Sequence, residues 1–253
     1  MKPAMKPAMK PNFTPILAAI REHAAACAPR ECCGLAIVKK GKLRYVPCRN
    51  LMDGNGVADV FLIDPEDYAA AEDIGAVVAV VHSHVNLPPV PSMADRVGIE
   101  GGTLPWLIVN HPVGTWSVTE PAGYVAPYVG RPFVHGVLDC YTIIRDWYLR
   151  ERGIALPDYA RADRWWEKGG EGGDLYRQNF AHAGFVQIDE RELQPGDVIL
   201  MQAMSPVTNH GAIYLGGNVI LQHVMGRLSS RDVWGGAWRK SATHFLRYVG
   251  GAA

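Results

Sequence analysis

Residues 76–95 read AVVAVVHSHVNLPPVPSMAD. The apolar run at residues 76–81 predicts a buried strand that carries the following residues out of the core at its end. His82 and His84 are two residues apart along this strand, so their rings point to one side while Ser83 points to the other. The stretch therefore predicts a buried strand that ends in two converging imidazoles.

A loop at residues 86–91 leads from the histidines to a helix start. Ser92 is a residue type favoured at helix caps, and Asp95 falls in the first turn, so the loop can bring this carboxylate back to the histidine pair. Three such ligands leave a fourth position for water, as in catalytic Zn²⁺ sites. In the alternative interpretation, Ser92 and Asp95 form only a capping box and the histidines are a polar strand end. The fixed spacing of the four residues favours the zinc site.

Upstream, residues 31–34 read ECCG. With this segment the pattern resembles the motif of the JAMM (MPN-type) metallopeptidases. The resemblance implies three zinc ligands, namely His82, His84 and Asp95. It also implies that Glu31 is the general base for the zinc-bound water and that Ser92 helps to stabilise the oxyanion. A carboxylate beside such a water can accept its proton. Taken alone, Glu31 would be interpreted as a surface carboxylate at a strand start.

Composition excludes several classes of protein. The 25 basic and 25 acidic residues balance, and only the first eleven residues contain a basic run, so we expect no nucleic acid as the main partner. No stretch is long enough to span a membrane, and the N-terminus lacks the apolar segment of a signal peptide. We therefore expect that the chain does not insert into a membrane and that it folds in a cytoplasm. The five cysteines contain no C-x-x-C pair, which argues against a disulfide framework or a zinc ribbon.

The remaining pattern predicts two domains. The Lys-Pro repeat at residues 1–13 is expected to be disordered, and a mixed α+β domain is expected at residues 14–120. Its helices are expected at residues 14–28 and 65–73, and its other strands at residues 34–39, 43–47, 104–109 and 115–118. A Pro- and Gly-rich stretch at residues 121–132 predicts a linker, so the second domain is expected at residues 133–253.

The second domain begins with a helix start at Asp139-Cys140. Apolar residues at helical spacing follow, and Gly153 is the expected stop. Asp139 is the expected cap, so Cys140 falls in the first turn, where backbone N–H groups and the helix dipole favour a thiolate nucleophile. In the alternative interpretation, Cys140 is an inert buried residue.

Two short strands are expected at residues 210–215 and 218–223, joined by a turn at Gly216-Gly217. If Leu215 pairs with Asn218, His210 lies opposite His223, with Cβ atoms about 5 Å apart. One histidine can then orient the other, which completes the nucleophile, base and orienting group of a thiol peptidase. The alternative is a pair of exposed histidines at strand ends.

Four segments in order, DCYTIIRDWY, LQPGDVILM, NHGAIYLG and VILQHV, resemble the NlpC-type papain-like peptidases, which cleave bacterial cell-wall peptides. The resemblance covers residues 133–248 and implies Cys140 as nucleophile, His210 as general base and His223 as the orienting residue. Many cell-wall members have Ser-Gly after the cysteine, where this chain has Tyr141-Thr142. The expected fold class is α+β, with an N-terminal JAMM-like domain and a C-terminal papain-like NlpC domain.

A JAMM-like domain followed by an NlpC-type domain resembles the tail tip assembly proteins of lambda-like phages. The resemblance implies assembly with other tail tip proteins in the host cytoplasm, with a place at the tail tip of the virion. Peptidoglycan peptides or tail proteins are then the expected substrates. Three functions stay open: a tail tip peptidoglycan endopeptidase, a zinc-dependent protease acting in tail assembly, and an assembly factor without catalysis.

Overall fold

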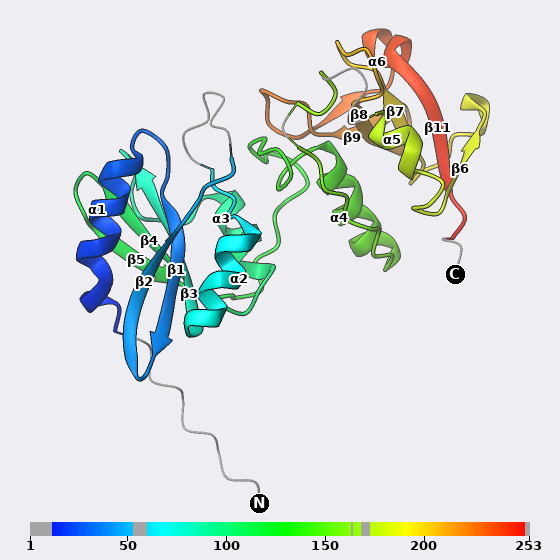
Figure 1. Cartoon of the computed structure of the whole chain (residues 1–253). Coiled ribbons are helices and arrows are strands. Elements are labelled where there is room, and N and C mark those ends of the chain that lie inside the picture. The colour runs from blue at the N-terminus through cyan, green and yellow to red at the C-terminus, as the bar shows by residue number, and fades with distance from the viewer. Residues whose placement is uncertain (1–11, 53–59, 163, 168–172, 251–253) are drawn as a thin grey trace, which may run out of the picture. The chain divides into compact units, whose positions relative to one another are not determined.

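The computed structural model describes residues 12–52, 60–162, 164–167 and 173–250. These described residues form two compact units, which divide between Tyr124 and Val125 (Figure 1). Most of the Lys-Pro repeat, residues 1–11, lies outside the described residues, whereas Phe13 is buried in the N-terminal core. The limits expected for the domains and the linker stay a prediction.

The N-terminal unit is built on a five-stranded sheet with the order β2-β1-β3-β4-β5. Its strands are β1 (Cys33–Lys39), β2 (Lys42–Cys48), β3 (Ala76–Val85), β4 (Trp106–His111) and β5 (Trp116–Thr119). Only β3 and β4 pair in parallel, and their ladder continues through His82↔Ile108 and His84↔Asn110. Strand β3 therefore extends beyond the expected run of residues 76–81, so both histidines lie inside a hydrogen-bonded strand.

Helices cover both faces of this sheet (Figure 1). The helices are η1 (Thr14–Ile16), α1 (Leu17–Cys27), α2 (Pro65–Ile74) and α3 (Met93–Glu100). Ile20 of α1 packs against Val81 on one face, while Ala71 of α2 belongs to the core on the other. Because side chains alternate along a strand, His82 and His84 lie on the face opposite α1. This face also carries Asp95 of α3, within hydrogen-bond distance of His84.

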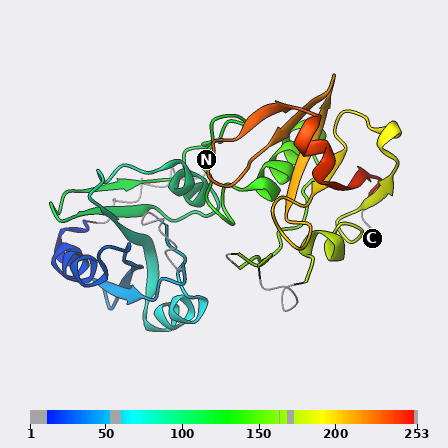
Figure 2. The same ribbon diagram turned by 90° about the horizontal axis from the view of Figure 1, so that it is seen from above.

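The C-terminal unit contains a six-stranded antiparallel sheet with the order β10-β9-β8-β7-β11-β6. Its strands are β6 (Phe185–Ile188), β7 (Val198–Met201), β8 (His210–Gly216), β9 (Val219–Gln222), β10 (Ser230–Val233) and β11 (Ala242–Tyr248). The helices are α4 (Cys140–Arg152), α5 (Leu175–Asn179), η2 (Glu190–Glu192) and α6 (Gly236–Ser241). Figures 1 and 2 show α4 against one sheet face, where Ile143 and Tyr148 join the core.

Helix α4 ends as its sequence predicts, and it also anchors the segment before it. Gly153 adopts the left-handed conformation, with φ 68°, that glycine enters at least cost. The guanidinium of Arg131 is fully buried and donates to the carbonyls of Ala126 and Pro127 and to Asp146 of α4. Part of the Pro- and Gly-rich stretch is thereby packed against the helix.

The hairpin between β8 and β9 corrects the expected strand register. The turn lies at Gly217-Asn218 instead of Gly216-Gly217, because Gly216 pairs with Val219. Gly217 and Asn218 both adopt positive φ, 57° and 61°, as a tight I′-type hairpin turn requires. An irregularity between Tyr214 and Gly216 adds one residue, so Ala212 pairs with Gln222. The predicted pairing of His210 with His223 is therefore wrong.

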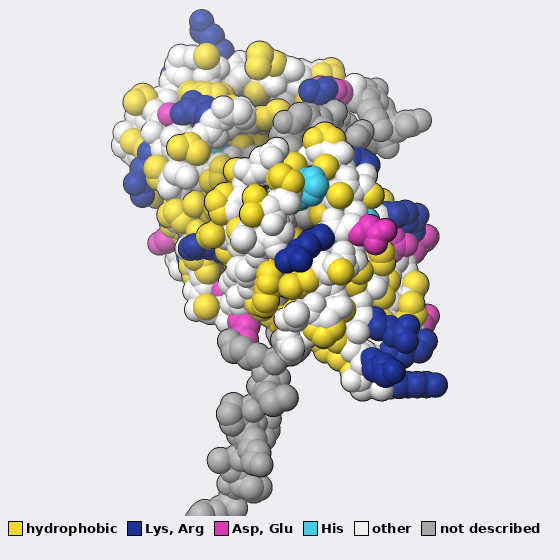
Figure 3. Space-filling view, turned by 90° about the vertical axis from the view of Figure 1, so that its left-hand side faces the viewer, with side chains coloured by type: hydrophobic (Ala, Val, Ile, Leu, Met, Phe, Trp, Pro, Cys, Tyr) yellow, Lys and Arg dark blue, Asp and Glu magenta, His cyan; other side chains and the backbone are white. Residues whose placement is uncertain are grey.

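Within the described residues, no helix is both long enough and apolar enough to cross a membrane. On the face shown in Figure 3, basic side chains lie among hydrophobic and uncharged ones, and a group of basic side chains lies together at the lower right of the view. Acidic side chains are also present on this face. Both signs of charge thus occur there, as they do in the sequence as a whole.

Candidate active sites

Three side chains of the N-terminal unit point their donor atoms at one small volume. His82 Nε2 lies 3.2 Å from His84 Nε2 and 3.3 Å from Asp95 Oδ1, and His84 Nε2 lies 3.2 Å from Asp95 Oδ2. A tetrahedral zinc ion with bonds of 2.0–2.1 Å separates its ligand atoms by about 3.3 Å. The distance between the two histidine nitrogens matches one edge of such a tetrahedron, and each nitrogen lies at a similar distance from one of the two Asp95 oxygens.

Local hydrogen bonds hold two of these ligands in place. His84 Nδ1 lies 2.8 Å from the Pro88 carbonyl, which can only accept, so Nδ1 carries the proton and Nε2 keeps its lone pair. Ser92 and Asp95 form the capping box of α3, in which Ser92 Oγ accepts from the Asp95 N–H at 3.1 Å. The capping box of the alternative interpretation is thus present, and its carboxylate contacts both histidines as well.

Glu31 lies beside this cluster and is 2 % exposed, so it is a buried carboxylate and not a surface one. Its Oε1 is 3.9 Å from His84 Nε2, and Glu31, His82 and His84 together could hold a metal ion. Ser83, on the other side of β3, accepts a hydrogen bond from the Cys32 N–H at 2.9 Å. This bond ties the segment that carries Glu31 to the strand that carries the histidines.

The surroundings favour the charge states of a metal site. Burial lowers the pKa of His82, which favours the neutral imidazole that binds a metal. Burial opposes the charge of Asp95, but its contacts with His82, His84 and Ser92 hold the pKa of Asp95 below its usual range. Phe61 stacks on the His82 ring at 4.5 Å between centroids, and the edge of Trp106 packs against it. One carboxylate and two neutral imidazoles thus meet beside an apolar wall.

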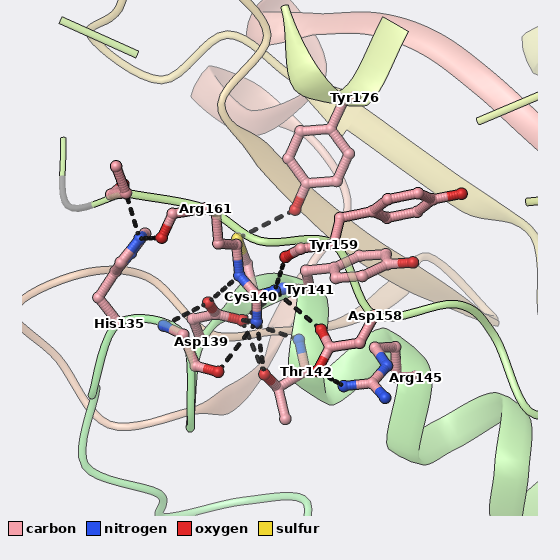
Figure 4. A network of polar contacts seen from close by, with 12 residues as sticks. His135, Asp139, Cys140, Tyr141, Thr142, Arg145, Asp158, Tyr159, Arg161 and Tyr176 are labelled. Carbon is pink, nitrogen blue, oxygen red and sulfur yellow. Dashed lines mark hydrogen bonds and ion pairs between the residues drawn. The ribbon is translucent and has the colours of Figure 1, made fainter. Parts of the chain in front are cut away.

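In the C-terminal unit, Asp139 fixes the start of α4 and hence the position of Cys140. Its carboxylate accepts from the backbone N–H groups of Tyr141 and Thr142 at 3.1 and 2.8 Å. Arg161 donates to the same carboxylate at 2.7 Å (Figure 4). The Arg161 guanidinium also donates to Gly136, Thr142, Asp158 and Tyr159, so all its N–H groups are engaged within the protein.

The Cys140 thiol is not activated by the helix start alone. Burial, and then the adjacent Asp139 carboxylate, raise the pKa of Cys140 to about 11. The thiol therefore needs a base, contrary to the expectation that the helix N-terminus favours a thiolate. Tyr176 Oη lies 3.2 Å from Cys140 Sγ, as the dashed line in Figure 4 shows. Gly211 leaves room for this hydroxyl, since a Cβ there would lie 3.3 Å from it.

His210 is held by a glutamine. Its Nε2 lies 2.8 Å from Gln222 Oε1, and Gln222 Nε2 donates to Asp232 Oδ2 at 2.6 Å. Burial lowers the pKa of His210, so its ring is neutral near pH 7. His223 is also fully buried and packs edge-on against Phe133. The structure thus places Gln222, and not His223, against the ring of His210.

Cys140, His210 and His223 line one cavity of about 120 Å³. Several aromatic side chains line it as well, among them Trp165, Trp166 and Tyr141. The predicted nucleophile and base are thus brought together.

Comparison with known proteins shows which family the chain belongs to. Over 230 residues it is 40% identical to tail tip assembly protein K of Escherichia phage N15, a match that covers 91% of this chain and 93% of that protein. The chain belongs to the tail tip assembly protein K family. Tail tip assembly protein K of Escherichia phage lambda is also 40% identical, over 184 residues, covering 73% of this chain and 87% of that protein.

The two halves of this tail tip protein match two domain families. Residues 13–120 match the prokaryotic homologs of the JAB domain, and residues 130–247 match the NlpC/P60 family. The NlpC/P60 domain indicates a peptidase. The family and the two-domain α+β fold class expected from the sequence are confirmed.

Two solved structures each match about half of the chain. An NLP/P60-family protein from Staphylococcus aureus subsp. aureus Mu50, described as similar to a lipoprotein, matches with 23% identity and a TM-score of 0.36, covering 49% of this chain and 38% of that one. A JAB1/MPN domain protein from Archaeoglobus fulgidus matches with 22% identity and a TM-score of 0.30, covering 44% of this chain and 90% of that one.

Sequence reasoning missed three residues of the tail tip protein's cysteine site. Gln222 could not have been found from the turn alone, because its pairing with Ala212 also depends on the irregularity between Tyr214 and Gly216. Tyr176 and Arg161 carry no local signal, since each is brought to Cys140 or Asp139 from more than twenty positions away along the chain.

Proposed function

We propose that this chain is a phage tail tip component that cleaves peptidoglycan stem peptides at Cys140 and carries a second, zinc-dependent peptidase or isopeptidase site. In this proposal Cys140 is the nucleophile, His210 the general base and Gln222 the orienting residue. The observation that carries it is the cavity shared by Cys140 and His210, with the second ring nitrogen of His210 bound by Gln222.

The cysteine site can perform both halves of a peptide hydrolysis. His210 Nδ1 takes the proton of the Cys140 thiol, and Sγ attacks the scissile carbonyl carbon. The protonated His210 then gives this proton to the leaving amine as the C–N bond breaks, which leaves a thioester on Cys140. Water, deprotonated by His210, cleaves the thioester and releases the carboxylic acid and the free thiol.

The N-terminal unit fits a zinc-dependent hydrolase. In the proposal, His82, His84 and Asp95 hold Zn²⁺, and the distances of 3.2–3.3 Å between their ring nitrogens and carboxylate oxygens support this. When bound, zinc would lower the pKa of its water to about 7 and polarise a substrate carbonyl. Buried Glu31 accepts a proton from the attacking water, and we assign Ser92 to the oxyanion side of the site.

Mass spectrometry of digested peptidoglycan tests the cysteine site. Purified peptidoglycan is incubated with the intact protein, with Cys140→Ala and with chelator-treated protein, and Cys27→Ala is the matched cysteine control. We expect muropeptides cut within the stem from every form except Cys140→Ala. Cleavage by Cys140→Ala would overturn the assignment, and loss with the chelator alone would move the wall activity to the zinc site.

Metal analysis of the purified protein tests the zinc site. We expect about one zinc per chain in the wild type, with loss of the metal in His82→Ala and in Asp95→Ala. His111→Ala removes a histidine of β4 outside the cluster and should keep the metal. Equal zinc content in all four proteins would contradict the proposed ligands.

Tail proteins are the alternative substrates. Chelator-sensitive processing of a tail protein that survives Cys140→Ala would identify a zinc-dependent assembly protease. Tail assembly that survives combined Glu31→Gln and Cys140→Ala substitution, with no cleavage of peptidoglycan by the wild type, would identify an assembly factor without catalysis.

A further inference from the structure

A chain of polar contacts extends from His210 to the opposite edge of the β8-β9-β10 segment. Gln222 of β9 is fully buried, and its amide lies between His210 of β8 and Asp232 of β10. Asp232 is in turn bound by Arg227 at 3.0 Å and by the hydroxyl of Ser230 at 3.0 Å. The carboxylate that ends this chain is therefore itself held in place.

Asp232 decides which way the Gln222 amide points. A carboxylate only accepts hydrogen bonds, so it binds the NH₂ end of the amide, here at 2.6 Å. The reversed amide would place its oxygen against the carboxylate, with two acceptors in contact and no proton between them. With the NH₂ end bound to Asp232, the amide oxygen faces His210 Nε2.

The amide oxygen in turn decides the tautomer of His210. It can only accept, so His210 Nε2 carries the proton and Nδ1 keeps the lone pair. Burial lowers the pKa of His210, and a neutral ring has two possible tautomers. Only the tautomer with the lone pair on Nδ1 can take a proton from Cys140 while Nε2 stays bound to Gln222.

We propose that Asp232 is a positioning residue of the cysteine site, which fixes the Gln222 amide and through it the tautomer of His210 that deprotonates Cys140. This inference rests on the proposed roles of Cys140 and His210. The charged and titratable groups that act on His210 or lie beside it include Arg227, Asp232 and His223. The shared cavity also carries Cys140, His135, Asp139, Tyr141, Tyr159, Arg161 and Tyr176. Among them, Asp232 is the one joined to the ring through an orientable amide.

The pH profile of Cys140 alkylation tests the inference without a peptide substrate. Iodoacetamide labelling is followed by mass spectrometry of the peptide that contains Cys140, from neutral to strongly alkaline pH. At neutral pH we expect Asp232→Ala to react about tenfold more slowly than the wild type. At alkaline pH, where hydroxide forms the thiolate, the two rates should converge.

Two further substitutions at Asp232 sharpen the test. Asp232→Asn keeps an acceptor for the amide and should lose less rate than Asp232→Ala. Asp232→Lys places a donor there, which favours the reversed amide and should slow the reaction most. Where peptidase activity is measured, kcat should fall in the same order with KM unchanged, because the base and not substrate binding is affected.

Asp189→Ala, which removes another arginine-paired carboxylate, is the matched control and should keep the wild-type profile. A wild-type rate at neutral pH in Asp232→Ala, or an equal loss at every pH, would overturn the inference. His210→Ala separates it from the proposed function. If His210→Ala reacts slowly while Asp232→Ala does not, only the role of Asp232 fails; if His210→Ala matches the wild type, the base itself is wrongly assigned.

Discussion

At the scale of single residues, burial sets the chemistry of both sites. Cys140 is a helix-start cysteine whose pKa is nevertheless raised to about 11, because desolvation and the Asp139 carboxylate outweigh the helix N-terminus. The buried histidines behave in the same way, since the pKa values of His82, His210 and His223 are all lowered. Burial therefore favours the neutral forms of Cys140 and of these three histidines.

His223 should make the fold sensitive to acid. Burial lowers its pKa to about 4, against 6.5 for an ordinary histidine, so the unfolded chain binds the extra proton first. Its contribution to the free energy of unfolding is complete above pH 6.5 and is lost as the pH falls towards 4. Urea unfolding across this range should show a shallower pH dependence in His223→Gln. An unchanged pH dependence of the free energy of unfolding would show that His223 does not cause the sensitivity to acid.

Arg161 should stabilise the folded protein by pairing with the buried carboxylate of Asp139. Both side chains are buried, at 9 % and 3 % exposure, so Arg161→Met leaves an unpaired buried carboxylate and should lower the free energy of unfolding by about 3–5 kcal/mol. The double variant with Asp139→Asn removes this charge and should recover part of the loss in urea unfolding. No recovery in the double variant would mean that the ion pair is not the cause.

At the scale of elements, the turn and the irregularity of one hairpin decide which side chain meets His210. The two positive φ angles at Gly217-Asn218, with the irregularity before Gly216, shift β9 by one residue against the expected register. A one-residue shift exchanges the faces of all following side chains, and it places Gln222 where His223 was expected. A short loop thereby determines the composition of the site.

Substitution of Asn218 tests this turn. Asn218 adopts φ 61°, a conformation that a β-branched side chain enters at a cost of about 1–2 kcal/mol. Asn218→Val should lower the free energy of unfolding by about this amount, whereas Asn218→Gly should change it little. Equal stability of the two variants in urea unfolding would argue against the left-handed turn.

At the scale of the whole molecule, two compact units each have their own sheet and core. The proposed metal ligands belong only to the N-terminal unit, and the cysteine site belongs only to the C-terminal unit. A ligand that binds only the folded form stabilises the unit that holds it, by about 2.7 kcal/mol at a hundredfold excess over its Kd. Zinc binding should therefore stabilise only the N-terminal unit, and it should leave the reactivity of Cys140 in the C-terminal unit unchanged.

Scanning calorimetry tests this separation. Zinc added to chelator-treated protein should raise the melting temperature of one transition and leave the other unchanged. His82→Ala should abolish the shift, while the rate of Cys140 alkylation stays at the wild-type value. A shift of both transitions by the same amount would indicate that the two units unfold as one.

The sequence by itself determined the two-domain α+β organisation, the convergence of His82, His84 and Asp95, and the start of α4 at Cys140. These features follow from short-range rules, namely strand alternation, helix caps and an apolar run, which act within about twenty residues. Strand ends were predicted less well, because β3 continues for as long as β4 pairs with it.

Only the tertiary structure decided what surrounds these residues. It buried Glu31, carried Tyr176 and Arg161 to the start of α4, and set Gln222 and Asp232 behind His210. These contacts join segments that are distant along the chain or depend on a one-residue irregularity in a hairpin. Their energies arise from burial and from the satisfaction of buried polar groups, which no local sequence pattern encodes.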